Sequence, residues 1–312
     1  MSTKSELLKL LDENCGAFVS GQKIGSELGI SRAAINKAAA VLKKSGYKIL
    51  SRPSRGYMLL EKTDFISEES VGVFITHPHH IKIVDRLKST NGYAKSLEAS
   101  DIPTIVISER DSETESESIL SLSILFKPDF ILDEAPFITL ASGLAVCHAI
   151  DAVCGTNTRI KWVNDIYSEG KRVSSFITEA QTNIETGRIN SLVIGVSINC
   201  FPTKKYPVAV GGDAFVADKS DAFSRSALAG MVADNLLSAI EKFRNRKFIP
   251  EYKRRCFILG KNIYIHPLSG ADPIKARAID IDDNGGLVIE YMEGMRMREI
   301  VTLTSGEVSL RE

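Results

Sequence analysis

The chain has 312 residues, of which 44% are hydrophobic and 25% charged, which is typical of an ordinary globular protein with two or three domains. No apolar run approaches the ~18 residues that span a membrane, and the first residues lack the apolar core of a signal peptide, so we expect a cytoplasmic protein without a membrane partner. The formal net charge is zero, and the five scattered cysteines argue against a disulfide framework or a zinc site.

The charge is unevenly distributed along the chain. Residues 1–60 contain ten lysines or arginines and four acidic residues, which gives +6, so the remaining residues carry −6. No acidic residue lies between Leu28 and Leu60. A basic module joined to an acidic body indicates that the first segment binds a polyanion.

The basic module has the pattern of a winged helix-turn-helix. Apolar spacing predicts a helix over 5–11, a second helix capped by Ser20, and a third helix over 31–44. Two short strands follow, at 47–50 and 57–60, around a tip that contains glycine and proline.

This module offers side chains suited to DNA. The third helix fits a major groove, where Asn36 can recognise a base edge and Arg32 can recognise guanine or bind a phosphate. Arg52 and Arg55 at the wing tip can reach the backbone or the minor groove. The alternative is a small solvated helical domain whose basic face binds nothing. The predicted DNA contacts are Ser31, Arg32, Asn36, Lys37, Arg52 and Arg55.

The body alternates predicted strands and helices, which indicates an α/β or α+β domain. Strands are predicted at 104–108, 120–126, 159–162, 175–179 and 192–198, and helices at 137–153 and 223–243. The histidine-rich stretch 77–80 predicts a loop, and no metal site is expected there because no carboxylate or thiol stands at ligand spacing.

The tail, residues 256–312, predicts a small SH3-like β-barrel. Short strands are expected at 262–266, 275–280, 286–291 and 299–303. The sequence Asp-Asp-Asn-Gly-Gly at 282–286 is a strong hairpin turn.

Several motifs, taken in order, resemble the biotin protein ligases. They are Ser-Thr-Asn at 89–91, Lys-Trp-Val-Asn-Asp-Ile-Tyr at 161–167, Gly-Lys-Arg at 170–172, Gly-Val-Ser-Ile-Asn at 195–199, and the closing segment 303–310. With a winged helix in front, the chain resembles the bifunctional type, the biotin operon repressors. The resemblance implies a multidomain α+β fold with a winged helix-turn-helix at 1–62, a class II synthetase-like central domain at 66–255 and an SH3-like barrel at 256–312.

The resemblance also implies a chemistry. In the family, the biotin carboxylate attacks the α-phosphate of ATP, and a lysine of a biotin carboxyl carrier protein then accepts the biotin from biotinyl-adenylate. ATP with magnesium is implied only if this activity is retained. The implied ligand-binding positions are Ser89, Thr90, Asn91, Trp162, Asn164, Asp165, Arg172, Ser175, Ser197 and Asn199.

The sequence departs from the family where the reactants meet. The family's GRGRxGR loop is replaced by the shorter connector 109–118, which has five acidic residues, one arginine and no glycine. Each carboxylate beside a phosphate costs ~1 kcal/mol in solvent. Arg172 stands at the catalytic lysine position, and Ser175 and Ser197 stand where the family has glycine. No catalytic residue is therefore expected to be intact.

The sequence thus predicts a repressor-like transcription regulator on a ligase scaffold whose ligase activity is lost, bound as a homodimer to double-stranded operator DNA. The sequence assigns no definite cofactor to this protein. Biotin and biotinyl-adenylate are the candidate ligands. One alternative is a divergent, active bifunctional ligase and repressor that also binds a carrier protein. Another is an interaction protein that dimerises with an active paralogue.

Overall fold

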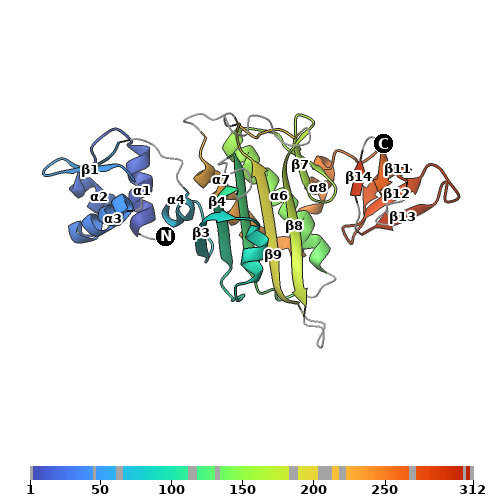
Figure 1. The fold of residues 1–312 in the computed structure, drawn as a ribbon, viewed down its shortest axis with the longest axis horizontal. Helices are drawn as coiled ribbons and strands as arrows, with labels where there is room; N and C mark the ends of the chain where they lie inside the picture. Colours follow the sequence, from blue (N-terminus) through green and yellow to red (C-terminus); the bar gives the residue numbers. More distant parts are fainter. Residues whose placement is uncertain are drawn as a thin grey trace.

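The computed structural model describes residues 3–44, 47–60, 66–111, 118–130, 134–182, 189–202, 213–217, 223–266, 272–304 and 307–309. Three parts follow one another along its long axis in chain order (Figure 1). They are a small helical part with a β-hairpin, a central sheet covered by helices, and a small terminal sheet. The predicted multidomain α+β fold class is confirmed.

The first part is a winged helix-turn-helix, as predicted. It contains α1 (Thr3–Glu13), α2 (Gly21–Leu28), α3 (Arg32–Lys44), β1 (Ile49–Arg52) and β2 (Gly56–Leu59). Ser20 caps α2 by accepting a hydrogen bond from the Lys23 amide, and Gly29 ends the helix in the left-handed conformation. The first strand begins two residues later than predicted and extends into the tip, because Arg52 pairs with Gly56.

The central part is built on a seven-stranded sheet with the order β3-β4-β5-β9-β8-β7-β6. Its strands are β3 (His80–Leu87), β4 (Thr104–Asp111), β5 (Ile119–Phe126), β6 (Arg159–Lys161), β7 (Asp165–Ser168), β8 (Lys171–Thr182) and β9 (Ile189–Asn199). β3 and β4 run parallel, and the other neighbours are antiparallel. The loop predicted at 77–80 is wrong at His80, where β3 begins. This strand lies at an edge, so its side chains are half-buried or exposed and give a weak apolar signal.

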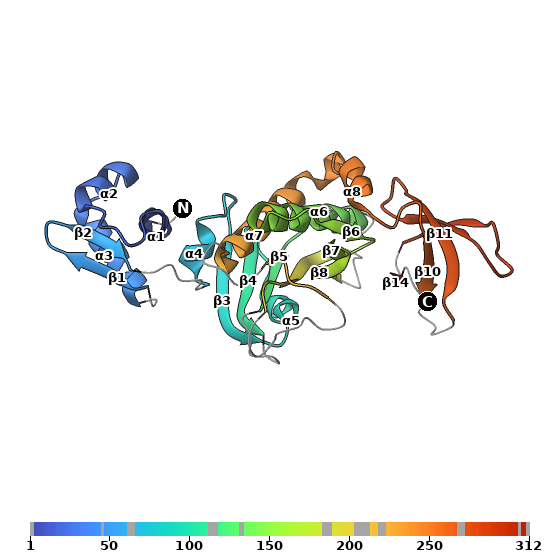
Figure 2. The same cartoon turned by 90° about the horizontal axis from the view of Figure 1, so that it is seen from above.

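Helices cover both faces of this sheet (Figure 2). α6 (Ala135–Cys154) and α7 (Arg225–Lys242) lie on one face, next to α8 (Ile249–Arg255), while α5 (Thr90–Lys95) lies on the other. The short α4 (Glu68–Gly72) follows the first part and contacts α1 and α7.

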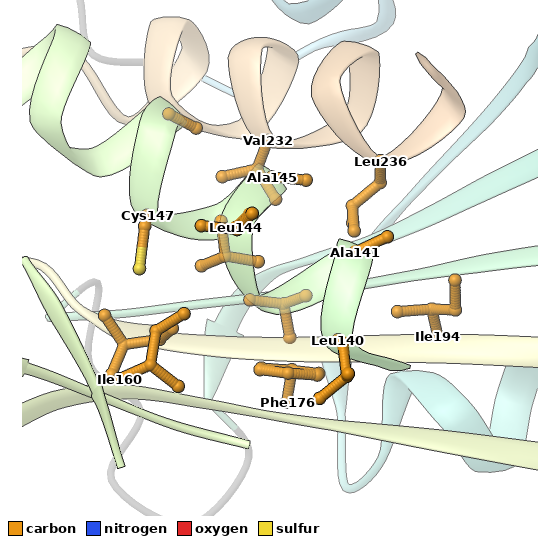
Figure 3. Close-up of a cluster of buried hydrophobic side chains, with 14 of the residues drawn as sticks. Leu140, Ala141, Leu144, Ala145, Cys147, Ile160, Phe176, Ile194, Val232 and Leu236 are labelled. Carbon is orange, nitrogen blue, oxygen red and sulfur yellow. The ribbon is translucent and has the colours of Figure 1, made fainter. Parts of the chain in front are cut away.

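The main core lies between α6, α7 and the sheet. Figure 3 shows Leu140 of α6 pointing at Phe176 of β8, and Ala141 and Ala145 facing Leu236 and Val232 of α7. α6 is long and apolar enough to cross a membrane, but 67% of its apolar window is buried inside the structure, which is typical of a core helix.

The terminal part is a five-stranded antiparallel sheet with the order β13-β12-β11-β10-β14. Its strands are β10 (Asn262–His266), β11 (Ile274–Ile281), β12 (Leu287–Tyr291), β13 (Ile300–Leu303) and β14 (Glu307–Ser309). The predicted turn is present, because the Asp282 amide donates to the Gly286 carbonyl at 2.9 Å. The sequence does not predict β14, which has only three residues.

Candidate functional site

A groove of about 600 Å³ lies between the start of α2, the exposed face of α3 and the wing formed by β1 and β2. Arg32, Asn36 and Arg52 line it. Ser31 lies at the start of α3, where its hydroxyl accepts a hydrogen bond from the Ala34 amide at 3.2 Å and so caps the helix. All six predicted DNA contacts are exposed: Ser31, Arg32, Asn36, Lys37, Arg52 and Arg55.

The wing is held against the segment that precedes α2. Val19 and Tyr57 exchange two backbone hydrogen bonds of 2.8 and 2.9 Å. A Cβ at Gly56 would overlap the Val19 carbonyl oxygen, so glycine is needed for this close approach. A bridge between segments 38 residues apart has no local signature, so the sequence does not predict this contact.

The ring of Phe18 lies beneath both wing arginines. The guanidinium carbon of Arg55 is 4.7 Å from the ring centroid, and that of Arg52 is 5.8 Å away. These are cation–π distances. Phe18 therefore restrains the two charges that the sequence assigns to DNA.

A second hollow, of about 420 Å³, opens on the central sheet near the start of α5. Three serines line it in register, because Ser121 on β5 pairs with Ser197 on β9, which pairs with Ser175 on β8. Side chains of directly paired residues project to the same face of a sheet, so the hollow has a row of hydroxyls. The predicted ligand positions that line it are Ser89, Thr90, Asn91, Asn164, Ser175 and Ser197.

Asn91 is fixed as part of the wall. Its amide nitrogen donates to Glu179 at 2.5 Å, and its oxygen accepts from the Ser123 hydroxyl at 2.6 Å. A Cβ at Gly195 would overlap this side chain, so the glycine leaves room for Asn91 itself. Hydrogen bonds from Lys95 and then Asn91 hold the pKa of the Glu179 carboxyl below its usual value.

The Arg172 side chain forms ion pairs with carboxylates of the same chain. Its Nε lies 3.1 Å from Asp213 Oδ1, its Nη2 lies 3.1 Å from Asp213 Oδ2, and its Nη1 lies 3.5 Å from Asp165. Asp165 also pairs with Lys161 at 3.3 Å. The hydrogen bonds that Arg172 donates to Asp213 raise the pKa of Arg172, so the guanidinium stays charged and is paired with carboxylates. Asp213 lies 41 residues away along the chain, so the sequence does not predict this contact.

Four predicted ligand positions do not line this hollow, namely Asp165 and Arg172, described above, and Trp162 and Asn199. Trp162 is 3% exposed, and its indole N–H donates to the Gly285 carbonyl at 3.3 Å, which joins the central and terminal parts. Asn199 ends β9, where its carbonyl accepts from the Val216 amide at 2.9 Å.

The acidic connector is only partly a loop. The predicted loop is wrong over 109–111, because these residues extend β4. The buried Arg225 donates to the Glu109 carbonyl at 3.0 Å, which fixes the end of that strand. Residues 112–117, which include three of the five acids, lie outside the described residues.

His77 has a structural partner. Its Nδ1 is 2.7 Å from an Asp234 carboxylate oxygen on α7. Within the described ranges, no group of three or more histidine, cysteine or carboxylate side chains is arranged to hold a metal ion.

Three family models match the chain in order. Residues 3–58 match the model described as HTH domain, residues 85–199 match the biotin/lipoate A/B protein ligase family, and residues 259–311 match the biotin protein ligase C terminal domain. These matches follow the three parts of the structure.

Whole-chain relatives combine the same parts. The chain is 28% identical to the bifunctional ligase/repressor BirA of Bacillus subtilis, over 94% of this chain and 95% of that protein. It is 24% identical to the protein of the same description from Escherichia coli, over 95% and 94%.

Among solved structures, the fold is similar to the apo biotin protein ligase from Aquifex aeolicus, with a TM-score of 0.60 and 21% identity over 75% of this chain and 99% of that one. A biotin protein ligase-like protein of unknown function from Silicibacter is also similar, with a TM-score of 0.56 and 14% identity over 73% and 96%.

Proposed function

We propose, because this chain is homologous to the bifunctional BirA ligase/repressors, that it is a DNA-binding transcription regulator whose ligase site has lost acyl transfer. The groove lined by Arg32, Asn36 and Arg52 supports the first half of this proposal. We assign DNA binding to residues 1–62, the former ligase domain to 66–255 and the terminal domain to 256–312.

The single observation that carries the loss of activity is the state of Arg172. Adenylation joins two anions, so a ligase needs positive charge that is free to bind them. Here the arginine at the lysine position already binds Asp213 and Asp165. The acids in 109–118 add negative charge where the family has its arginine-rich loop.

The row of serines also supports the loss of ligase activity. Ser175 and Ser197 add hydroxyl groups where the family leaves glycine against the ligand. Burying an apolar ligand chain against hydroxyl groups, without forming hydrogen bonds to them, costs free energy. We therefore expect the hollow to bind a polar small molecule better than biotin.

The second candidate is an active, divergent bifunctional ligase and repressor. The retained hollow of about 420 Å³ favours it, because a cavity of this size can take a small ligand. This candidate would bind biotin and ATP with magnesium, and it would also dock a biotin carboxyl carrier protein.

One experiment separates the candidates. The full chain is incubated with biotin, ATP, magnesium and a carrier domain, beside a relative that has the GRGRxGR loop as the positive control. We expect no transferred biotin and no pyrophosphate release from the chain. Biotinylated carrier would overturn the loss of activity and establish the second candidate.

DNA binding is tested separately. We expect the chain to bind an inverted-repeat operator as a homodimer, and Arg32→Ala to weaken that binding by about 1–3 kcal/mol if Arg32 recognises a base. An unchanged dissociation constant at fixed salt would reject that role for Arg32.

A further inference from the structure

Asn36 is exposed on α3, but one side of its amide is already engaged. The hydroxyl of Tyr57 donates a hydrogen bond to Asn36 Oδ1. Tyr57 is only 9% exposed and packs in the core of the first part, and it lines the groove together with Asn36. The oxygen and nitrogen of a planar amide lie on opposite corners, so Nδ2 lies on the side of the amide away from the Tyr57 hydroxyl, and Asn36 lines the groove.

The position of Tyr57 is itself fixed. Its backbone N–H donates to the Val19 carbonyl at 2.9 Å, and its carbonyl accepts from the Val19 amide at 2.8 Å. Because Tyr57 belongs to β2, the orientation of the Asn36 amide is tied to the docking of the wing.

This orientation changes what Asn36 can recognise. An asparagine that recognises adenine accepts from the base N6 and donates to N7 at the same time. Tyr57 takes one of the two acceptor positions of the Asn36 oxygen, so donation by the two amide hydrogens is favoured over acceptance from a base. Arg32, one helical turn earlier on the same face, offers only donors. Guanine presents two acceptors, N7 and O6, to such a surface.

We propose that Asn36 is a specificity-determining residue that selects guanine over adenine, because Tyr57 engages its carbonyl oxygen. The proposal rests on the proposed DNA-binding function. It implies an operator half-site with two nearby guanines, one contacted by Arg32 and one by Asn36.

The test is selection of duplexes from a random DNA pool by the full-length protein, followed by sequencing. The wild-type protein should enrich a motif that contains guanines. At one of these positions, the preference for guanine should be lost in the Asn36→Ala variant. At that position, Tyr57→Phe should raise the ratio of adenine to guanine about tenfold, since the freed oxygen can accept from adenine N6.

Tyr47→Phe is the matched control. Tyr47 is also buried in this part, but its hydroxyl is 2.9 Å from Ser67, away from the groove. This variant should keep the wild-type motif.

A measurement on the wild-type protein tests the proposal without relying on the correct folding of the variants. Replacing the Asn36-dependent guanine by 7-deazaguanine deletes the N7 acceptor and should lower wild-type affinity about fivefold, but leave Asn36→Ala unchanged. Adenine at that position in the wild-type motif, an unchanged motif in Tyr57→Phe, or no effect of 7-deazaguanine on wild type would each overturn the inference alone. No enriched motif from any protein would overturn the DNA-binding function together with it.

Discussion

At the scale of single residues, an aromatic ring organises the charges of the wing. Phe18 lies 4.7 Å from Arg55 and 5.8 Å from Arg52. Phe18→Leu keeps an apolar side chain but removes the π face, so both arginines lose a restraint. We expect DNA affinity to fall by about 0.5–1 kcal/mol at fixed salt, with the base preference unchanged. Fluorescence anisotropy on the selected operator measures this effect.

The mechanism is checked by a double-mutant cycle with Arg55→Ala. If Phe18 acts through Arg55, the double variant should bind about as well as Arg55→Ala alone. Fully additive losses would show that the ring acts on DNA or on folding directly.

A second residue-scale prediction concerns pH. The pKa of Glu179 is lowered by hydrogen bonds from Lys95 and then Asn91, so these contacts stabilise the fold above the unfolded pKa of about 4.3 and are lost as the pH falls through the folded value. Glu179→Gln should therefore lower the free energy of unfolding by about 1 kcal/mol at pH 7, and by less as the pH approaches 3.

Denaturant titrations at several pH values measure this difference. Glu98→Gln, which changes an exposed carboxylate on a nearby segment, is the control and should leave the free energy of unfolding unchanged. A deficit in Glu179→Gln that is equally large at pH 3 would contradict an ionic origin.

At this scale the sequence predicts site residues but not the residues that they contact. Ser175 and Ser197 were found through motif positions, and the structure places them in the same hollow. Ser121 was missed, because its place beside Ser197 depends on strand register. Asp213 was missed because it reaches Arg172 from a distant segment.

At the scale of elements, the wing depends on one close backbone approach. A Cβ at Gly56 would overlap the Val19 carbonyl, and the φ of Gly56 is +97°. Gly56→Ala should lower the stability of the winged helix by about 2–4 kcal/mol and weaken DNA binding with it.

The Gly16→Ala variant separates the cost of a positive φ from the cost of the Cβ overlap in this prediction. Gly16 has a similar φ of +81°, but a Cβ there would meet nothing within 4 Å. It should cost only about 1 kcal/mol, the left-handed penalty of a non-glycine residue. Equal losses in the two variants, measured by denaturant unfolding, would refute the overlap argument.

Which elements the sequence predicts depends on how strongly each one is buried. The core helix α6 and the turn at 282–286 have clear apolar or turn signals and were found. The edge strand β3 was missed because its side chains are half-buried or exposed, and β14 because it is three residues long. Their pairing comes from tertiary context rather than from local pattern.

At the scale of the whole molecule, the first and central parts are joined by specific contacts. Lys4 pairs with Glu69 on α4, and the Tyr47 hydroxyl bonds Ser67. Within the central part, Ser70 on α4 bonds Ser226 on α7 at 2.9 Å, which anchors this helix. The order of the parts follows from sequence motifs, whereas these junction contacts do not. Such contacts, or dimerisation, offer routes by which a ligand bound in the central part could influence DNA binding.

The state of Arg172 leads to a prediction for this coupling. Regulation by an adenylate requires that the adenylate bind, and Asp213 and Asp165 already bind Arg172, to which we assign the lysine position of the family. Biotin with ATP should therefore change the operator dissociation constant by less than about twofold, whereas an ordinary allosteric coupling gives about 5–150-fold. Titrations of labelled operator with and without both compounds measure the ratio of the two dissociation constants.

Arg172→Ala is the matched variant, and it should behave as wild type. A ligand effect above fivefold in wild type that disappears in Arg172→Ala would show that this arginine still binds the ligand, and the regulator would then be controlled by the site we consider lost.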